Sequence, residues 1–215
     1  MEKVVFYVDG FNFYYGLKTT KNARPQWVDY YWIDFVKFFQ QFLSPTQELA
    51  KVVYFTATPL NKQKAQRQGA LLKANQLINK DSFEIVRGKY FTKYYPCPNC
   101  KISVPKPEEK RTDVNISVRM IEDCIKDYGD IAVLVSADSD LVPPIKFIRE
   151  YFPSKKIRVY FPPSNNCSDL ANTMRLNKGK VVFLLNNEVK FRNSIMDDRI
   201  EIDGDIVTKP EKWNR

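Results

Sequence analysis

Short apolar runs alternate along the chain with longer segments in which apolar residues recur at helical spacing. The apolar runs predict strands at residues 3–8, 51–58, 83–90, 130–137, 156–161 and 180–185. The helical periodicity predicts helices at residues 11–17, 32–43, 61–80, 112–129, 141–151 and 168–175. Strands that alternate with amphipathic helices predict an α/β fold with a mostly parallel sheet and helices on both faces.

The helix expected at residues 112–129 shows this periodicity most clearly. Thr112 is the expected N-cap, and the expected buried face is formed by Val114, Val118, Ile121 and Ile125. One helix later, Asp138 or Asp140 is expected to cap residues 141–151, because the two prolines at 143 and 144 fit only a first helical turn.

Three segments interrupt the pattern. Residues 18–26 are polar and basic and predict a loop, and residues 96–107 are proline-rich and predict an exposed loop or hairpin inserted near residues 94–108. The polar segment from 186 to 215 is either an extension or a partly disordered tail. A chain of 215 residues fits one domain, and we place that domain at residues 1–185 with a C-terminal extension at residues 186–215.

Composition excludes several classes of protein. No stretch of about 18 apolar residues occurs, so no membrane association is expected, and residues 1–6 lack the order of a secretory signal. A cytoplasmic protein is therefore expected, and disulfides among Cys97, Cys100, Cys124 and Cys167 are not. The chain has no histidine, which excludes serine–histidine–aspartate triads, cysteine–histidine pairs and zinc sites with histidine ligands.

The net charge of +9 favours an anionic partner, chiefly nucleic acid, although many basic proteins bind none. Without histidine, carboxylates and a metal are the strongest candidates for chemistry. Asp9 ends the first predicted strand, Asp138 and Asp140 follow the central one, and Asp113 begins the helix before it. If the first and fourth strands are neighbours, all four carboxylates meet beyond the carboxyl ends of the strands, where open sheets bind ligands.

Each aspartate singly has a structural explanation as a cap or turn residue. Together they would repel one another unless cations neutralise them. Hard oxygen ligands suit Mg²⁺ or Mn²⁺, which activates water and offsets charge on a leaving oxygen, and two ions about 4 Å apart would do both. We therefore expect a metal-dependent hydrolase with Asp9, Asp113, Asp138 and Asp140 as catalytic residues and metal ligands.

Three segments carry a resemblance to a known family. They are VDGFN at 8–12, EKRTDVN at 109–115 and SADSDLVP at 136–143. In order and spacing they resemble NYN domains, and most closely the LabA-like group of the PIN-like nuclease superfamily, over residues 3 to about 185. The resemblance implies a PIN-like Rossmannoid sheet and a metal-dependent ribonuclease site. It also implies that Asn12 is a polar site residue and that Ser136 lies at the lip of the central strand.

The chain departs from the resemblance in one place. Family members often have another acidic residue near residues 170–176, where this chain has none, and the register of the nearby Asp169 is uncertain. This departure puts a second metal in doubt and leaves one-metal catalysis or weak catalysis open.

A basic surface is expected beside the acidic cluster. Its cations are Lys62, Lys64, Arg67, Lys73, Arg87, Lys89, Lys93, Lys101, Lys106, Lys110 and Arg111. Lys110 and Arg111 are the best candidates for phosphate contacts, with RNA, single-stranded or structured, as the expected partner. Tyr94 and Tyr95 are interleaved with these cations, whereas Tyr90 and Phe91 are expected to pack in the core.

Other interpretations stay open. Cys97 and Cys100 have the spacing of half a zinc knuckle. An unliganded loop is the favoured interpretation, and a zinc ion shared across a homodimer is the alternative. An RNA-binding regulatory protein with weak or no catalysis is the alternative to the endoribonuclease. A phosphatase on the same kind of sheet is a third candidate, although no second aspartate follows Asp9 two residues later and no phosphate-binding GxxxxGK[ST] loop exists.

Overall fold

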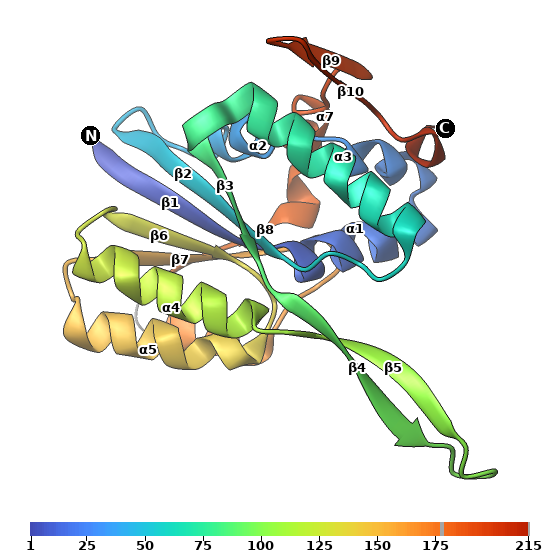
Figure 1. The fold of residues 1–215 in the computed structure, drawn as a ribbon. Helices are drawn as coiled ribbons and strands as arrows, with labels where there is room; N and C mark the ends of the chain where they lie inside the picture. The colour runs from blue at the N-terminus through green and yellow to red at the C-terminus, as the bar shows by residue number, and fades with distance from the viewer. Residues whose placement is uncertain (177–178, 215) are drawn as a thin grey trace.

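Six parallel strands form the central sheet of the computed structural model, in the spatial order β3-β2-β1-β6-β7-β8 (Figure 1). They are β1 (Glu2–Asp9), β2 (Gln47–Thr56), β3 (Phe83–Arg87), β6 (Ile131–Val135), β7 (Lys156–Phe161) and β8 (Lys180–Phe183). The structure describes residues 1–176 and 179–214. The side chains of residues 105–109, Lys106 of the expected basic surface included, lie outside that description.

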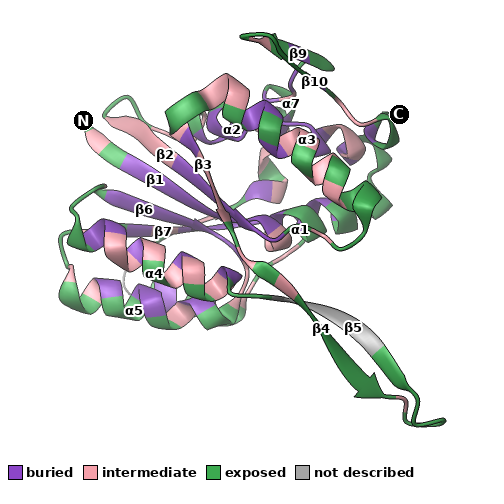
Figure 2. Cartoon of the chain, viewed as in Figure 1, coloured by how far each residue is buried: buried purple, intermediate pink, exposed green. Residues whose placement is uncertain are grey.

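Helices cover both faces of this sheet. One face packs against α1 (Gly10–Ala23), α2 (Phe35–Gln40) and α3 (Lys62–Asn79), and the other against α4 (Thr112–Ile125), α5 (Val142–Tyr151) and α6 (Ser168–Arg175). Successive residues of β1 enter opposite cores: Phe6 packs on the first face and Tyr7 on the second. Figure 2 shows the strands buried between the two helical layers. The predicted parallel α/β sheet is confirmed.

The strand order determines where a ligand can bind. β1 pairs with β2 on one side and with β6 on the other, so the direction of winding reverses between β1 and β6. In doubly wound sheets the crevice at this reversal, outside the carboxyl ends of the strands, is the usual binding site. The neighbouring first and fourth predicted strands are therefore confirmed as β1 and β6.

Two helices differ from the expected boundaries. α1 continues to Ala23, so the loop expected at residues 18–26 is wrong over most of its length. α2 begins only at Phe35, because Asp34 caps it by accepting a hydrogen bond from the Lys37 N–H at 3.0 Å. A 3₁₀ segment, η1 (Pro25–Tyr31), occupies the chain before it.

The expected buried face of α4 is wrong at three of its four residues, and only Ile121, which is half-buried, packs against the core. Val114, Val118 and Ile125 are exposed (63%, 59% and 68%), whereas the buried stripe is Ile116, Met120 and Cys124. Both stripes have helical spacing, and the one that contacts β1 and α5 is selected by tertiary packing. The helix begins at Thr112 with Arg111 at the N-cap position, so the expected cap at Thr112 is wrong by one residue.

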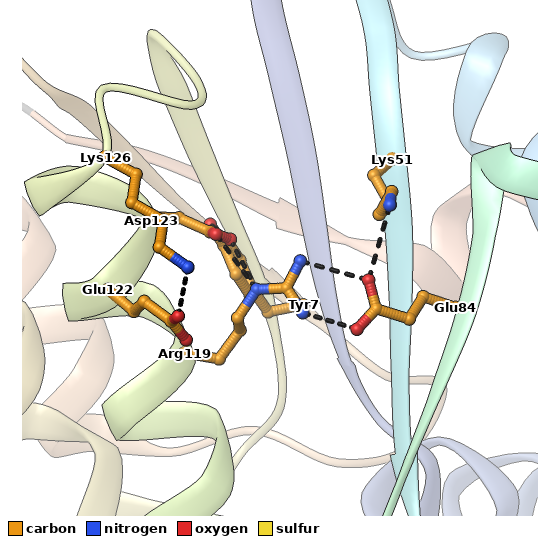
Figure 3. A network of polar contacts seen from close by, with 7 residues as sticks. All are labelled: Tyr7, Lys51, Glu84, Arg119, Glu122, Asp123 and Lys126. Atoms are coloured by element: carbon orange, nitrogen blue, oxygen red, sulfur yellow. Dashed lines mark hydrogen bonds and ion pairs between the residues drawn. The ribbon is translucent and has the colours of Figure 1, made fainter.

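A polar network fastens α4 to the sheet (Figure 3). Arg119 donates to both oxygens of Asp123 at 2.9 Å and to both oxygens of Glu84, on β3, at 2.6 and 3.1 Å. Asp123 also accepts from the buried Tyr7 hydroxyl of β1 at 2.8 Å, and Lys51 of β2 pairs with Glu84 at 3.4 Å. Three strands thus hold the helix that has Asp113 in its first turn.

A two-stranded arm leaves the domain between β3 and α4 (Figure 1). It is formed by β4 (Lys89–Pro96) and β5 (Ser103–Lys110), which pair antiparallel along their whole length. The hairpin alternative for the inserted segment is therefore correct, but the arm is longer than expected. The third predicted strand is correspondingly shorter and ends at Arg87.

The segment after β8 is folded. It forms η4 (Leu184–Asn187), α7 (Glu188–Arg192), a hairpin of β9 (Arg199–Ile202) and β10 (Asp205–Thr208), and η5 (Glu211–Trp213). Its buried residues Phe191, Met196, Ile200, Val207 and Trp213 belong to the core on the α1–α3 side.

Two further 3₁₀ turns are η2 (Lys80–Ser82) and η3 (Ser139–Leu141). Of the helices in the described ranges, none has both the length and the apolar content needed to cross a membrane.

Candidate active site

The ends of β1 and β6 place two polar residues side by side. Val8 pairs with Val135 in the register of these strands, so the residues that follow them, Asp9 and Ser136, lie side by side. Both are buried, Asp9 at 1% exposure and Ser136 at 0%. The Ser136 hydroxyl donates to Asp9 Oδ2 at 2.8 Å and accepts from the Asp138 N–H at 3.1 Å. Asp9 is therefore linked to the loop that follows β6.

Every acceptor position of the Asp9 carboxylate is used. Oδ1 accepts from the N–H groups of Phe11 and Asn12 at 3.1 and 3.0 Å, which caps α1. Oδ2 accepts from the Asn12 amide at 2.7 Å as well as from Ser136. Burial raises the pKa of Asp9 above its ordinary value; the hydrogen bonds from Asn12 and Ser136 oppose that rise, and the Asp138 charge adds to it.

The other three aspartates converge. Asp113, Asp138 and Asp140 each offer a carboxylate oxygen within 4.8 Å of the others, and among the described residues this is the only group of three or more metal-ligating side chains. Asp113 comes from the first turn of α4, whereas the other two come from the turn after β6. Asp138 caps η3 by accepting from the Asp140 N–H at 2.9 Å, which holds the turn closed.

Of the four predicted aspartates, the structure thus brings three into one group and places Asp9 behind them. Asp113 and Asp138 are half-buried and Asp140 is exposed, so the group opens to solvent. Three carboxylate oxygens at this separation are the donor set that Mg²⁺ and Mn²⁺ prefer, with water completing the octahedron. The residues present therefore fit one hard divalent cation.

Asn12 and Ser136 lie at the site, where the resemblance placed them, but their described polar contacts are with protein. Asn12 holds Asp9, and its backbone carbonyl accepts from the Asn165 amide at 3.0 Å. Asn165, in the loop after β7, was missed because no motif in the sequence pointed to it. Gly10 was missed as well: a Cβ there would lie 2.5 Å from the Tyr54 ring and 2.7 Å from the Phe55 carbonyl oxygen.

The basic arm begins at the acidic group. Arg111 has a left-handed backbone (φ 79°) and lies over the Phe91 ring, 5.8 Å from its centroid. Lys110 ends β5 immediately before it. Phe91, Tyr94 and Tyr95 are 45%, 67% and 43% exposed, so the expectation that Phe91 packs in the core is wrong. Tyr90 is half-buried and contacts Phe11, 6.0 Å between ring centroids.

The four cysteines are free, and only Cys97 and Cys100 lie near each other. Cys97 and Cys100 are in the turn at the tip of the arm. The pKa of the Cys97 thiol is lowered there by hydrogen bonds from the backbone N–H groups of Cys100 and Asn99 and from the Cys100 thiol. Cys124 is buried in α4, and Cys167 precedes α6. Within the described part of the chain, no cysteine belongs to a group of three or more metal-ligating side chains.

Comparison with known families agrees with this geometry. The family model described as NYN domain matches residues 3–185, which include β1 to β8 and all four aspartates. The chain belongs to the NYN domain family. NYN domains are part of the PIN-like nuclease superfamily, and an acidic group is present within the matched residues.

One solved structure and one curated protein are similar to this NYN domain protein. The crystal structure of VPA0982, a protein of unknown function from Vibrio parahaemolyticus RIMD 2210633, has the same fold, with a TM-score of 0.54 at 20% sequence identity. The match covers 85% of this chain and 93% of the VPA0982 chain. The chain is also 25% identical over 184 residues to 6-hydroxy-3-succinoylpyridine 3-monooxygenase HspA from Pseudomonas putida (strain DSM 28022 / S16). That match includes 67% of this chain but only 55% of the relative.

The late acidic residue that NYN domains often have is not found in the group here. Asp169 lies in the first turn of α6 and is exposed, outside the three-aspartate group. The remaining residues of α6 up to Arg175 are not acidic. The carboxylates that the described residues bring together are therefore enough for one cation.

Proposed function

We propose that this NYN domain protein is an endoribonuclease that cleaves RNA phosphodiester bonds with water activated by Mg²⁺ or Mn²⁺. The observation that supports it most is the convergence of Asp113, Asp138 and Asp140 within 4.8 Å at the point where the sheet reverses its winding. A bound divalent cation would supply a water molecule of lowered pKa and would offset charge on the leaving oxygen.

The roles of the aspartates follow from their contacts. Asp113, Asp138 and Asp140 would hold the cation, and Asp9 orients the Asp138 loop through Ser136. Asp9 could itself ligate the cation only by giving up a hydrogen bond from Ser136 or Asn12, because its acceptor positions are filled. Asp9 keeps all of these hydrogen bonds if its role is to position the Asp138 loop and not to ligate the cation.

Charge around the site supports an RNA substrate. Arg111 stands two residues before Asp113, and the arm that ends there displays Lys89, Lys93, Lys101 and Lys110. Lysine and arginine neutralise phosphates, and the exposed rings of Phe91, Tyr94 and Tyr95 can stack on unpaired bases. We propose that Lys110 and Arg111 contact the phosphates that flank the cleaved bond.

Cleavage of RNA by the purified chain tests the proposal. With Mn²⁺ or Mg²⁺, the chain should cut a mixed RNA pool, and Asp138→Asn or excess chelator should abolish the cutting. Asp203→Asn, at an 82% exposed side chain in the β9–β10 turn, is the matched control and should cut normally. Cutting that survives both Asp138→Asn and the chelator would contradict the mechanism.

A second candidate is an RNA-binding regulatory protein with little or no catalysis. It is favoured by the single-cation ligand set and by the exposed Asp169, which together leave no second metal position among the described residues. Salt-sensitive RNA binding without cleavage under any divalent metal would establish this function and exclude the first. The proposed location is the cytoplasm, in keeping with four free cysteines, and the homodimer stays a prediction.

A further inference from the structure

A cavity of about 340 Å³ lies between α1 and α3, beside the acidic site. Gly10 and Phe11, the two residues that follow Asp9, form part of its wall, and so does Tyr54 of β2. The cavity therefore lies where β1 and β2 end, at the edge of the sheet that also carries the three-aspartate group. Its volume falls within the range of about 300–1,000 Å³ that is usual for small-ligand sites.

Aromatic rings dominate the lining of this cavity, which we call the α1–α3 cavity. They include Tyr14, Tyr15, Tyr31, Tyr54 and Tyr90. Tyr14 and Tyr15 are 38% and 43% exposed, whereas Tyr31 and Tyr54 are buried at 7% and 4%. Tyr14 lies 5.5 Å from Tyr31 between ring centroids, so the exposed rings rest on a buried aromatic layer. Such a wall offers flat faces that the protein already holds in place.

The charged residues of the lining have one sign. Lys18, Lys64 and Arg67 line the cavity, and none of the described lining residues is acidic. Lys18 lies over the Tyr15 ring at 5.5 Å from its centroid. The tyrosine rings can stack on a flat aromatic group, and the lysine and arginine side chains can bind a phosphate. The cavity therefore suits a ligand that contains both groups.

The wall also contains a fixed hydrogen-bonding group. Gln68 donates from its amide nitrogen to Thr56 Oγ1 at 2.8 Å and to the Ala57 carbonyl at 3.3 Å. Gln68 and Thr56 both line the cavity. An amide held in this way can meet the edge of a base, whose hydrogen-bonding groups must find partners when the base leaves water.

We propose that the α1–α3 cavity binds an unpaired base of single-stranded RNA while its cations contact the adjoining phosphates. This inference rests on the proposed ribonuclease function and adds that the substrate must be single-stranded at the site, because a paired base cannot enter a cavity. Stacking on a tyrosine face accepts any base, so the cavity selects for strandedness more than for sequence.

Binding of labelled RNA to full-length Asp138→Asn in chelator tests the inference without any turnover. The probes are a short single strand, its duplex, and an abasic strand of the same length and charge. The single strand should bind about fivefold or more tightly than the abasic strand, which is the effect of stacking a single base at the low end of its usual range. Equal affinity for the normal and abasic strands would overturn the proposal, and this comparison needs no cavity variant.

Variants then locate the base. In the Asp138→Asn background, Tyr14→Leu should remove most of the preference for normal over abasic RNA, whereas Tyr14→Phe should keep it. Tyr151→Leu, at a 61% exposed ring on α5, is the matched control and should also keep it. A preference that survives Tyr14→Leu together with Tyr15→Leu in a folded protein would contradict this location.

The two proposals can fail separately. Base-dependent binding with no metal-dependent cleavage in the wild-type chain would leave the cavity assignment standing and remove the nuclease. Cleavage of RNA by a chain that binds normal and abasic strands equally would do the reverse. Arg67→Gln should lower affinity for both strands, whereas Lys180→Gln, at the start of the edge strand β8, should lower neither.

Discussion

The Ser136 hydroxyl donates to the buried Asp9 carboxylate across the junction between β1 and β6, at 2.8 Å. The same oxygen accepts the Asp138 N–H, so one hydroxyl joins the helix-capping aspartate of β1 to the turn that supplies two cation ligands. A change at Ser136 should therefore affect both the stability of the domain and its binding of metal.

Ser136→Ala should lower the free energy of unfolding by about 1–3 kcal/mol, because it leaves an acceptor position of a buried carboxylate unfilled. It should also weaken Mn²⁺ binding, since the Asp138 N–H loses its acceptor. Chemical denaturation and metal titration measure the two effects. Ser139→Ala, three residues on and exposed, should change neither. An unaltered metal affinity in folded Ser136→Ala would show that the hydroxyl has no part in positioning the ligands.

Saturating Mn²⁺ should raise the melting temperature, because a ligand that binds only the native state adds about 2.7 kcal/mol at 100 times its dissociation constant. Neutralising one of the three converging aspartates, for example Asp113→Asn, should remove most of this gain. It should also raise stability in metal-free buffer, since only two of the three mutually repelling carboxylates then remain. Asp169→Asn should leave the metal-dependent gain intact.

Loss of the gain in Asp169→Asn would instead bring α6 into the metal site. Differential scanning calorimetry with and without chelator distinguishes these outcomes. The metal-free comparison is informative by itself, because a purely structural aspartate would give no stabilisation when neutralised.

The sheet and the place of the site were predictable from sequence because they follow from local patterns. Alternating strands and helices fix a parallel sheet, and parallel strands bring their carboxyl ends to one edge. Asp113 and Asp138 were found because each adjoins an element boundary that periodicity reveals. Asp9 was found in the same way, but its saturation with hydrogen bonds depends on Ser136, which is 127 residues away.

The errors arose where tertiary contacts choose between equivalent local patterns. Val118 and Met120 of α4 belong to two apolar stripes of similar spacing, and only packing on β1 and α5 decides which is buried. The arm was underestimated because strand pairing, not composition, extends it to Lys89 and Lys110. The α1–α3 cavity escaped detection altogether, because its walls come from segments separated along the chain.

Glu84→Gln should make stability less sensitive to acid. Hydrogen bonds from Arg119 hold the pKa of Glu84 below its ordinary value of 4.5, so the ion pair stabilises the fold fully at pH values above about 4.5. This stabilisation is lost as the pH falls from about 4.5 to below the lowered pKa. The wild type should thus lose more free energy of unfolding than Glu84→Gln between pH 6 and about pH 3.

The control is Glu122→Gln, which removes a carboxylate whose side chain is 45% exposed and which pairs with Lys126 on α4. Exposed pairs of this kind contribute little, so its acid dependence should match the wild type. Identical acid profiles for Glu84→Gln and Glu122→Gln would mean that the network of Figure 3 does not stabilise the fold through charge.

Gly10→Ala should damage both fold and site. A Cβ at position 10 would lie 2.7 Å from the Phe55 carbonyl oxygen, which belongs to a buried strand and cannot move away cheaply. α1 would have to shift from β2, taking the Asp9 cap and the wall of the α1–α3 cavity with it. We expect a decrease of about 1–3 kcal/mol in stability, as for other overpacked sites, with a parallel decrease in RNA binding. Gly69→Ala, where a Cβ meets nothing within 4 Å inside α3, should be neutral or stabilising.

Removal of the arm should separate RNA binding from chemistry. Lys89 and Lys110 face each other across the first pair of β4 and β5, so a two-residue turn can replace residues 90–109. The fold should persist, because none of the described arm residues belongs to either buried core cluster. RNA affinity should fall about tenfold or more, and the salt dependence of binding should flatten by about 0.7 for each phosphate that the arm no longer neutralises.

Hydrolysis of a small phosphodiester should survive the deletion, since that substrate needs only the cation held by Asp113, Asp138 and Asp140. Lys93→Gln with Lys101→Gln in an intact arm separates charge from stacking. If the double substitution flattens the salt dependence but the deletion costs more affinity, the rings that the deletion removes contribute the remainder: the exposed Phe91, Tyr94 and Tyr95, and the cavity-lining Tyr90. Undiminished RNA binding after the deletion would mean that the arm serves another purpose and that the RNA-binding surface lies on the body of the domain.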